Sequence, residues 1–135
     1  MGILRVAVSG YFNPLHIGHI QYFKAAKEIG QLIVIVNNDW QAMLKGNMFM
    51  PELERMEIIK NLKMVDKVVL SIDNDETVCK TLEKVRPYIF AKGGDRYIFE
   101  IPERDICGKL GIKIIDCVGG FKIQSSTALL KRKYG

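Results

Sequence analysis

The stretch VAVSGYFNPLHIGH at residues 6–19 decides the fold of this chain. It opens with small and β-branched residues, which are typical of a strand buried on both faces of a parallel sheet. Gly10 begins a turn, and the proline at position 14 favours a helix that begins near His16 and ends near Ile29. The stretch therefore predicts a strand, a turn and a helix in immediate succession.

Two histidines lie at the start of the predicted helix. His16 and His19 are three residues apart, so they share one face of its first turn. Free backbone N–H groups and the positive end of the helix macrodipole point the same way. Gly18 has no side chain, which lets a ligand approach the backbone closely. This combination predicts a phosphate-binding site at the start of the helix.

The remainder of the chain repeats the alternation of strand and helix. Strands are predicted at residues 3–9, 32–36, 65–71, 88–91 and 112–118. Helices are predicted at residues 16–29, 76–85, 102–110 and 128–133, another is opened by Pro51, and residues 40–50 form a loop or a short helix. The order indicates an α/β fold: a Rossmann-like parallel five-stranded sheet with helices on both faces, in a single domain over residues 1–135.

Polar and glycine-containing segments follow the predicted strand ends. Asp39 follows the second strand, Lys92 to Asp95 follow the fourth, and Ser125 to Thr127 open the last helix. Each segment also has a purely structural interpretation, as a turn or a helix cap. Ligands of an open parallel sheet bind beyond the carboxyl ends of its strands, so we expect these residues and the two histidines to form one nucleotide site.

Composition limits the alternatives. The chain has 135 residues, 48% of them hydrophobic, which suffices for one domain with a real core. No apolar run approaches the roughly 20 residues of a membrane span, and residues 1–3 lead straight into a strand without the pattern of a signal peptide. The three cysteines are odd in number and not closely spaced, which argues against disulfides and a zinc site. We therefore expect a cytoplasmic protein with no membrane partner.

The net charge of +5 suits a site that gathers phosphates. The basic residues are scattered and do not alternate with aromatic ones, so we expect no nucleic-acid partner. The one basic cluster, at residues 131–133, lies where the end of a helix favours cations.

The tetrad His16-Ile17-Gly18-His19 after a first strand resembles the H-x-G-H signature of the cytidylyltransferase-like nucleotidyltransferase family. Class I aminoacyl-tRNA synthetases carry the same tetrad, but this chain is too short for one and lacks a Lys-Met-Ser-Lys-Ser loop. The resemblance covers nearly the whole chain and is nearest to the glycerol-phosphate cytidylyltransferases and heptose-phosphate adenylyltransferases. A non-catalytic regulatory module of the same fold is the alternative.

This resemblance implies that a phosphate-monoester oxygen attacks the α-phosphorus of ATP or CTP and that pyrophosphate leaves. It implies Mg²⁺ bound through the nucleotide triphosphate, without protein metal ligands, and a homodimer. It implies catalytic roles for His16, His19 and Lys45. Implied nucleotide-binding residues are Gly10, Tyr11, Phe12, Gly18, Lys92, Gly93, Asp95, Ser125, Ser126 and Thr127, and implied substrate-binding residues are Asn13, Asp39 and Arg55.

Some of these positions have other interpretations. Lys45 is also typical of a solvated surface lysine, and Arg55 of an exposed helical arginine. The apolar residues within 43–50 suit either a lid or a dimer contact.

The chain departs from the family pattern in two places. Asn13 stands where many members have aspartate, so the contact that such a carboxylate makes is in doubt. Residues 119–122 replace the Arg-Thr-Glu-Gly run of the glycerol-phosphate enzymes, whereas Lys92 to Asp95 resemble the heptose-phosphate branch. Both ATP and CTP remain open, as do sugar, polyol and amino-alcohol phosphates and phosphonates as the acceptor.

Overall fold

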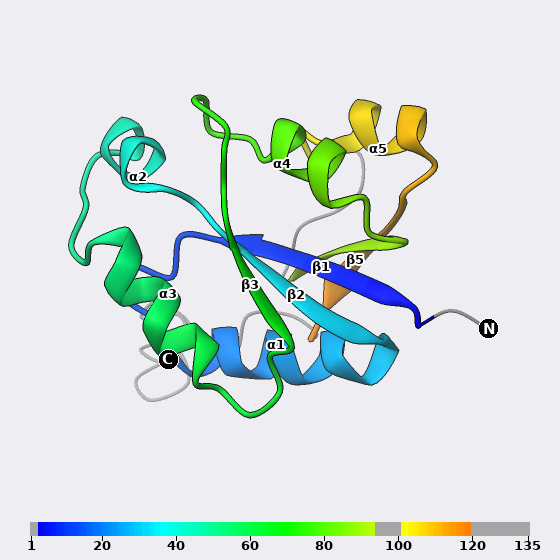
Figure 1. Cartoon of the computed structure of the whole chain (residues 1–135), viewed down its shortest axis with the longest axis horizontal. Coiled ribbons are helices and arrows are strands. Elements are labelled where there is room, and N and C mark those ends of the chain that lie inside the picture. Colours follow the sequence, from blue (N-terminus) through cyan, green and yellow to red (C-terminus); the bar gives the residue numbers. More distant parts are fainter. Residues whose placement is uncertain (1–2, 94–100, 120–135) are drawn as a thin grey trace, which may run out of the picture.

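A computed structural model describes residues 3–93 and 101–119 of the chain (Figure 1). The described strands are β1 (Arg5–Gly10), β2 (Gln31–Val36), β3 (Lys67–Leu70), β4 (Ile89–Gly93) and β5 (Lys113–Val118). The described helices are α1 (Ile17–Ile29), α2 (Asp39–Lys45), α3 (Glu52–Lys60), α4 (Cys79–Val85) and α5 (Arg104–Leu110). No helix in these ranges is long and apolar enough to cross a membrane.

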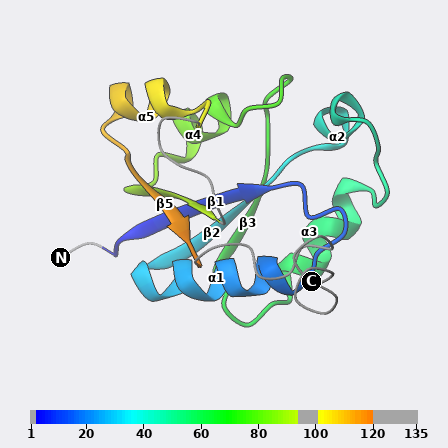
Figure 2. The same cartoon turned by 180° about the vertical axis from the view of Figure 1, so that it is seen from behind.

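All five strands form one parallel sheet in the order β3-β2-β1-β4-β5. The chain moves outward from β1 to β3 and then crosses back to the other side of β1. Figures 1 and 2 show α1 and α3 on one face of the sheet and α4 and α5 on the other, with α2 beyond the carboxyl end of β2. The predicted Rossmann-like sheet is confirmed, and its topological switch point lies between β1 and β4.

The strands are apolar on both faces because each face packs on helices. Val6 and Val8 on β1 pack with Phe23 of α1, whereas Ala7 between them packs with Leu82 of α4 and Cys107 of α5. Because neighbouring residues of β1 serve two opposite cores, this strand is fixed in the middle of the molecule. The loop that follows the carboxyl end of β1 is therefore anchored to a well-packed strand.

The predicted start of one helix needs correction. The helix expected at 76–85 begins only at Cys79, because the Asp75 side chain closes a turn by accepting bonds from the Thr77 N–H (2.9 Å) and hydroxyl (2.7 Å). The buried Asp73 carboxylate instead accepts the N–H of Lys80 (2.7 Å) and of Thr81 (3.0 Å) at the helix start. The segment expected as a loop or short helix contains α2, and the helix expected at 128–133 lies outside the described residues.

Candidate functional site

His16 and His19 form a reciprocal cap at the start of α1. The Nδ1 atom of His16 accepts the N–H of Gly18 at 3.1 Å, and the Nδ1 atom of His19 accepts the N–H of His16 at 3.0 Å. The N–H of His19 donates to the His16 carbonyl at 3.0 Å. The histidines thus share the first turn as predicted, but the expectation that its N–H groups are free is wrong for Gly18 and His19. A helix start satisfies its orphan donors with side chains where it can, and here the imidazoles do so.

This cap determines the chemistry that the rings present. Because both Nδ1 atoms accept hydrogen bonds, each neutral ring carries its proton on Nε2. The rings of His16 and His19 are stacked, with centroids 3.7 Å apart and planes 26° apart. The pair therefore presents two Nε2 positions, both able to donate, close together at the end of β1.

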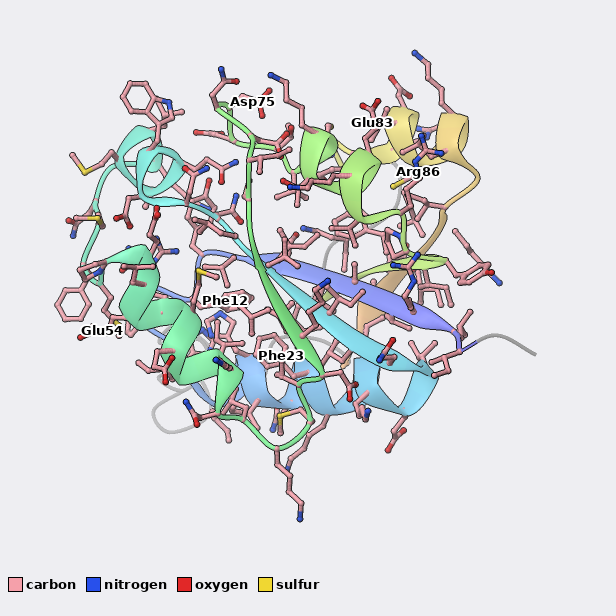
Figure 3. The ribbon with its side chains drawn as sticks, viewed as in Figure 1. Phe12, Phe23, Glu54, Asp75, Glu83 and Arg86 are labelled. Carbon is pink, nitrogen blue, oxygen red and sulfur yellow. The ribbon has the colours of Figure 1, made fainter. Side chains whose placement is uncertain are left out.

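The ring of Phe12 packs against His19 of the pair. Its ring meets the edge of His19 (centroids 4.9 Å apart) and Phe23 of α1 (5.2 Å), and it is only 3% exposed. Figure 3 shows both phenylalanine rings on the α1 side of the sheet. The predicted nucleotide contact of Phe12 can therefore come from its backbone, since its side chain is buried between His19 and Phe23.

Gly10 and Gly18 make room for these rings. A Cβ atom on Gly18 would lie 2.9 Å from Cε1 of His16, and one on Gly10 would lie 2.7 Å from Cζ of Phe12. Both separations are shorter than van der Waals contact allows. The sequence predicts that Gly18 lets a ligand approach, but the space beside it is taken by the His16 imidazole.

Lys45, at the end of α2, reaches the loop after β1. Its Nζ lies 4.5 Å from the centroid of the Tyr11 ring. At an exposed site such a cation–π contact is worth about 0.5–1 kcal/mol, less than the roughly 2 kcal/mol of rotamer entropy that a lysine carries. Burial raises the pKa of Tyr11, and the carboxylates of Glu76 and Glu103 raise it further. Lys45 therefore lies near the carboxyl end of β1, as predicted, but its contact with the Tyr11 ring is too weak to hold its side chain in one position.

Arg55 of α3 is buried beneath this loop, with 1% of its surface exposed, so the interpretation as an exposed helical arginine is wrong. Its Nη1 donates to the Tyr11 carbonyl (2.8 Å) and the Asn37 carbonyl (2.6 Å). Its Nε donates to the Met50 carbonyl (2.9 Å), and Nη2 pairs with Oδ1 of Asp39 (2.9 Å). The guanidinium therefore joins the chain segments that follow β1 and β2 and precede α3.

Asn13 makes a second connection between these segments. Its Nδ2 donates to the Asn47 carbonyl at 3.0 Å, and its Oδ1 accepts the N–H of Met50 at 2.7 Å. The contacts of Asn13, Asp39 and Arg55 with substrate stay predictions. In the structure these three side chains connect the segments that follow β1 and β2 and precede α3.

Lys92 and Gly93 lie at the switch point. Lys92 of β4 donates from Nζ to the Ser9 hydroxyl of β1 at 3.3 Å, and its Nζ lies 5.2 Å from the centroid of the Phe90 ring. Gly93 ends β4 against the ring of Tyr22. The structure therefore brings Lys92 to the same edge as the histidines and Lys45. Asp95, Ser125, Ser126 and Thr127 lie outside the described residues.

Glu103 is a buried acidic group that sequence reasoning missed. It is 3% exposed, and its Oε2 accepts the N–H of Val78 at 2.9 Å, while Oε1 has no hydrogen-bond partner among the described residues. Burial raises the pKa of the Cys107 thiol to about 11, with a smaller contribution from Glu103. Glu103 is the residue immediately before α5, and an acidic residue at a helix start is common, so the sequence offers no signal of this burial.

The described site therefore holds two imidazoles and two lysines around the ends of β1 and β4. These groups can donate hydrogen bonds and neutralise negative charge. The described residues contain no group of three or more His, Cys, Asp or Glu that could hold a metal ion. The arrangement suits a polyanion such as a triphosphate better than a protein-bound metal.

The chain is similar to known proteins over most of its length. A family model described as cytidylyltransferase-like matches residues 7–120. The chain is 35% identical over 114 residues to an FAD synthase of Thermoplasma volcanium, covering 83% of this chain and 79% of that protein. It is 34% identical over 131 residues to the bifunctional protein HldE of Nitratiruptor sp., covering 94% of this chain but 27% of that protein.

A solved structure is similar as well. It is described as the lipopolysaccharide core biosynthesis protein from Thermoplasma volcanium. It superposes with a TM-score of 0.73 at 32% identity and covers 86% of this chain and 97% of that one. The similarity extends over nearly the whole of the solved chain.

Proposed function

The chain belongs to the cytidylyltransferase-like family of nucleotidyltransferases, and on this premise we propose that it transfers AMP from ATP to a phosphate-monoester acceptor. The resemblance that the H-x-G-H tetrad indicated is thereby confirmed. Several similar proteins are named FAD synthase, an activity that transfers AMP from ATP to flavin mononucleotide and releases pyrophosphate. That name favours ATP over CTP, and it makes flavin mononucleotide the first acceptor to test.

The reaction depends on aligning the acceptor oxygen with the α-phosphorus and does not require a general base. A phosphate monoester is already ionised at neutral pH, so its oxygen attacks the α-phosphorus without losing a proton to the protein. One P–O bond forms between the acceptor and the α-phosphorus. The bond to the bridging oxygen breaks, and pyrophosphate leaves with that electron pair. Charge builds on the phosphate oxygens as this happens, and preorganised donors stabilise it.

The stacked His16–His19 pair is the observation that carries this proposal. Its reciprocal cap leaves Nε2 of each ring as the donor, at the carboxyl end of the strand beside the switch point. Two such donors suit adjacent oxygens of the α- and β-phosphates. Lys45 and Lys92 then neutralise the triphosphate and the acceptor phosphate from α2 and β4.

The remaining predicted nucleotide contacts belong to the same proposal. The backbone of Gly10 to Phe12 lines the phosphate position, whereas Gly18 leaves room for the His16 imidazole. Lys92 to Asp95 and the hydroxyls of Ser125 to Thr127 bind the nucleotide beyond β4 and β5. Asn13, Asp39 and Arg55 serve the substrate by holding the loops in place.

Magnesium fits this donor set as an ion carried by the nucleotide. The described residues offer imidazoles and ammonium groups at the site and no acidic cage, whereas Mg²⁺ prefers phosphate oxygens and water. When bound, it supplies charge neutralisation between the phosphates. The protein residues orient the same oxygens.

We also propose that the protein acts as a homodimer in the cytoplasm. Exposed apolar side chains on α2, on the connection after it and at the start of α3 support a contact with a second copy: Trp40, Met43, Leu44, Phe49 and Leu53. Light scattering behind a sizing column tests this, since a monomer mass at micromolar concentration contradicts the dimer.

Pyrophosphate release tests the main proposal. The full chain is incubated with Mg²⁺ and either ATP or CTP, each with flavin mononucleotide, a sugar 1-phosphate, glycerol 3-phosphate, an amino-alcohol phosphate or a phosphonate. We expect release with ATP and one acceptor, and an adenylylated product of matching mass. Release with CTP alone contradicts the choice of base. No release with any pair, while ATP still raises the melting temperature, favours a non-catalytic nucleotide-binding module.

A further inference from the structure

Asn13 joins two segments that lie far apart in sequence. It belongs to the loop between β1 and α1, and its side chain bonds the backbone of the connection between α2 and α3 at Asn47 (3.0 Å) and Met50 (2.7 Å). One amide thus donates through Nδ2 and accepts through Oδ1. A carboxylate has no hydrogen to donate to the Asn47 carbonyl, and an aliphatic side chain makes neither bond.

The bond to Asn47 acts on the end of α2. The N–H groups of Gly46 and Asn47 both return to the Ala42 carbonyl, at 3.1 and 3.2 Å. Gly46 has φ of +133°, a conformation that disfavours any residue with a side chain and lets the chain turn sharply after Lys45. Asn47 is therefore hydrogen-bonded to the last turn of α2. A bond that fixes the position of Asn47 also fixes the end of the helix that carries Lys45.

Both ends of the α2–α3 connection are linked to Tyr11: the Lys45 end directly, and the Met50 end through Arg55, which bonds both carbonyls. Lys45 covers the Tyr11 ring, and Tyr11 lies two residues before Asn13 in the same loop. The cation–π contact is too weak to order Lys45 by itself, so the position of its ammonium depends on where the helix end is held. Arg55 bonds the Met50 carbonyl from the other side and fixes the far end of the connection.

We propose that Asn13 is a positioning residue for Lys45: its amide clamps the α2–α3 connection to the β1–α1 loop and so holds the ammonium at the carboxyl end of β1. The inference rests on the proposed function, in which Lys45 contacts phosphate. It changes the expected role of Asn13 from a substrate contact to a support that acts through Lys45.

A double-mutant cycle on Mg-ATP affinity tests this. Calorimetry gives the Kd for the wild type, Asn13→Ala, Lys45→Ala and the double variant. We expect Asn13→Ala to weaken binding by roughly 3- to 10-fold, the size of a hydrogen bond's contribution. In the Lys45→Ala background the same change should cost less than about twofold, because the group it positions is gone. Equal losses in both backgrounds would overturn the proposal, since Asn13 would then act on the nucleotide directly.

Asn61→Ala is the matched control. Asn61 is an exposed asparagine whose Nδ2 bonds the Glu57 carbonyl at the end of α3 (2.7 Å), away from the loop after β1. We expect wild-type ATP affinity for this variant. A loss equal to that of Asn13→Ala would contradict a specific role for Asn13.

Amide hydrogen exchange of the free protein tests the clamp without nucleotide. Asn13→Ala should expose the Met50 N–H, which loses its acceptor, and should speed exchange at Gly46 and Asn47. Unchanged exchange at all three overturns the clamp even if the protein is active. If exchange changes but the wild type binds no nucleotide, the clamp stands and both the proposed function and the role assigned to Lys45 fail.

Discussion

The imidazoles of His16 and His19 cap one another's turn and stack at 3.7 Å. Each Nδ1 accepts a backbone N–H, at 3.1 and 3.0 Å. The same two hydrogen bonds therefore shape the first turn of α1 and place the proton of each neutral ring on Nε2. The tautomer of a histidine is set by the hydrogen bond that its other ring nitrogen makes, often with a backbone carbonyl or a carboxylate. Here the helix start supplies that bond, which lets a small domain orient two donors with few residues.

Capping and catalysis can be separated by substitution. His16→Asn keeps a good N-cap residue, and His19→Gln keeps the amide that a capping box uses, but both remove the imidazole ring and its donor. We expect the free energy of unfolding to change by less than about 1 kcal/mol, and AMP transfer to fall roughly 100- to 1000-fold. His16→Ala and His19→Ala should lower both the free energy of unfolding and the rate of AMP transfer. Turnover near that of the wild type in the Asn and Gln variants would remove the histidines from the mechanism.

The proton positions can be measured directly. The sequence has only two histidines, so ¹⁵N–¹H correlation through two bonds resolves both rings. In the neutral rings we expect the proton on Nε2 for each, because Nδ1 accepts a backbone N–H. A proton on Nδ1 of either ring would contradict the reciprocal cap. His16→Asn should leave a single resonance set, with His19 unchanged in tautomer.

Gly18 supplies a sharp test of packing around the pair. A Cβ there would lie 2.9 Å from Cε1 of His16, so Gly18→Ala should displace that ring and lower AMP transfer without unfolding the helix. Gly108→Ala is the control, because a Cβ on this α5 glycine meets nothing within 4 Å. That variant should gain about 0.5–1 kcal/mol of stability and keep its activity. Equal activity of both variants would show that His16 tolerates the methyl group.

The sequence predicted the sheet because local patterns determine it. The β-branched run at 32–36 and the glycine at position 30 mark a strand and a helix end without reference to other segments. The shared face of His16 and His19 also follows from spacing alone. Their Nδ1 bonds do not, since these depend on the residue at which the helix starts and on the rotamer of each ring.

Arg55 and Glu103 show what local patterns leave out. Arg55 lies four residues before the buried Ile59, so the two side chains share the inward face of α3. Its partners come from positions as much as 44 residues away in sequence, and a lone arginine among them carries no signal. Glu103 likewise bonds Val78, 25 residues away. Long-range polar contacts of this kind follow from the fold and not from the pattern.

Stability at low pH should depend in part on Asp66. Its pKa is lowered chiefly by the hydrogen bond from Lys27 (2.6 Å) and also by that from the Leu32 N–H (2.8 Å). Because the folded value lies below the unfolded one, this carboxylate stabilises the fold above the ordinary Asp pKa. That contribution disappears as pH falls through the folded value. The pair is partly exposed, so we expect about 1 kcal/mol at most.

Urea unfolding between pH 2 and pH 6 measures this effect. Asp66→Asn should be less stable than the wild type at pH 6, and the difference should close at the acid end. A difference that stays constant over the whole range would mean that Asp66 acts by packing and not by charge. High salt at pH 6 should also narrow the gap, since an exposed pair is screened.

Arg55 should contribute more to stability than any exposed cation of the same helix. Its guanidinium satisfies three backbone carbonyls and the Asp39 carboxylate, so Arg55→Ala leaves these acceptors unpaired. We expect a loss of roughly 3–5 kcal/mol in urea unfolding, as for a broken buried ion pair. Lys60→Ala, at an exposed position of α3, should change stability by no more than about 0.5 kcal/mol. Arg55→Lys should fall between them, because an ammonium cannot reach acceptors spread around a planar fork. If Arg55→Ala were as stable as Lys60→Ala, the loops around the site would have to be held by other contacts, and the support assigned to Arg55 would be wrong.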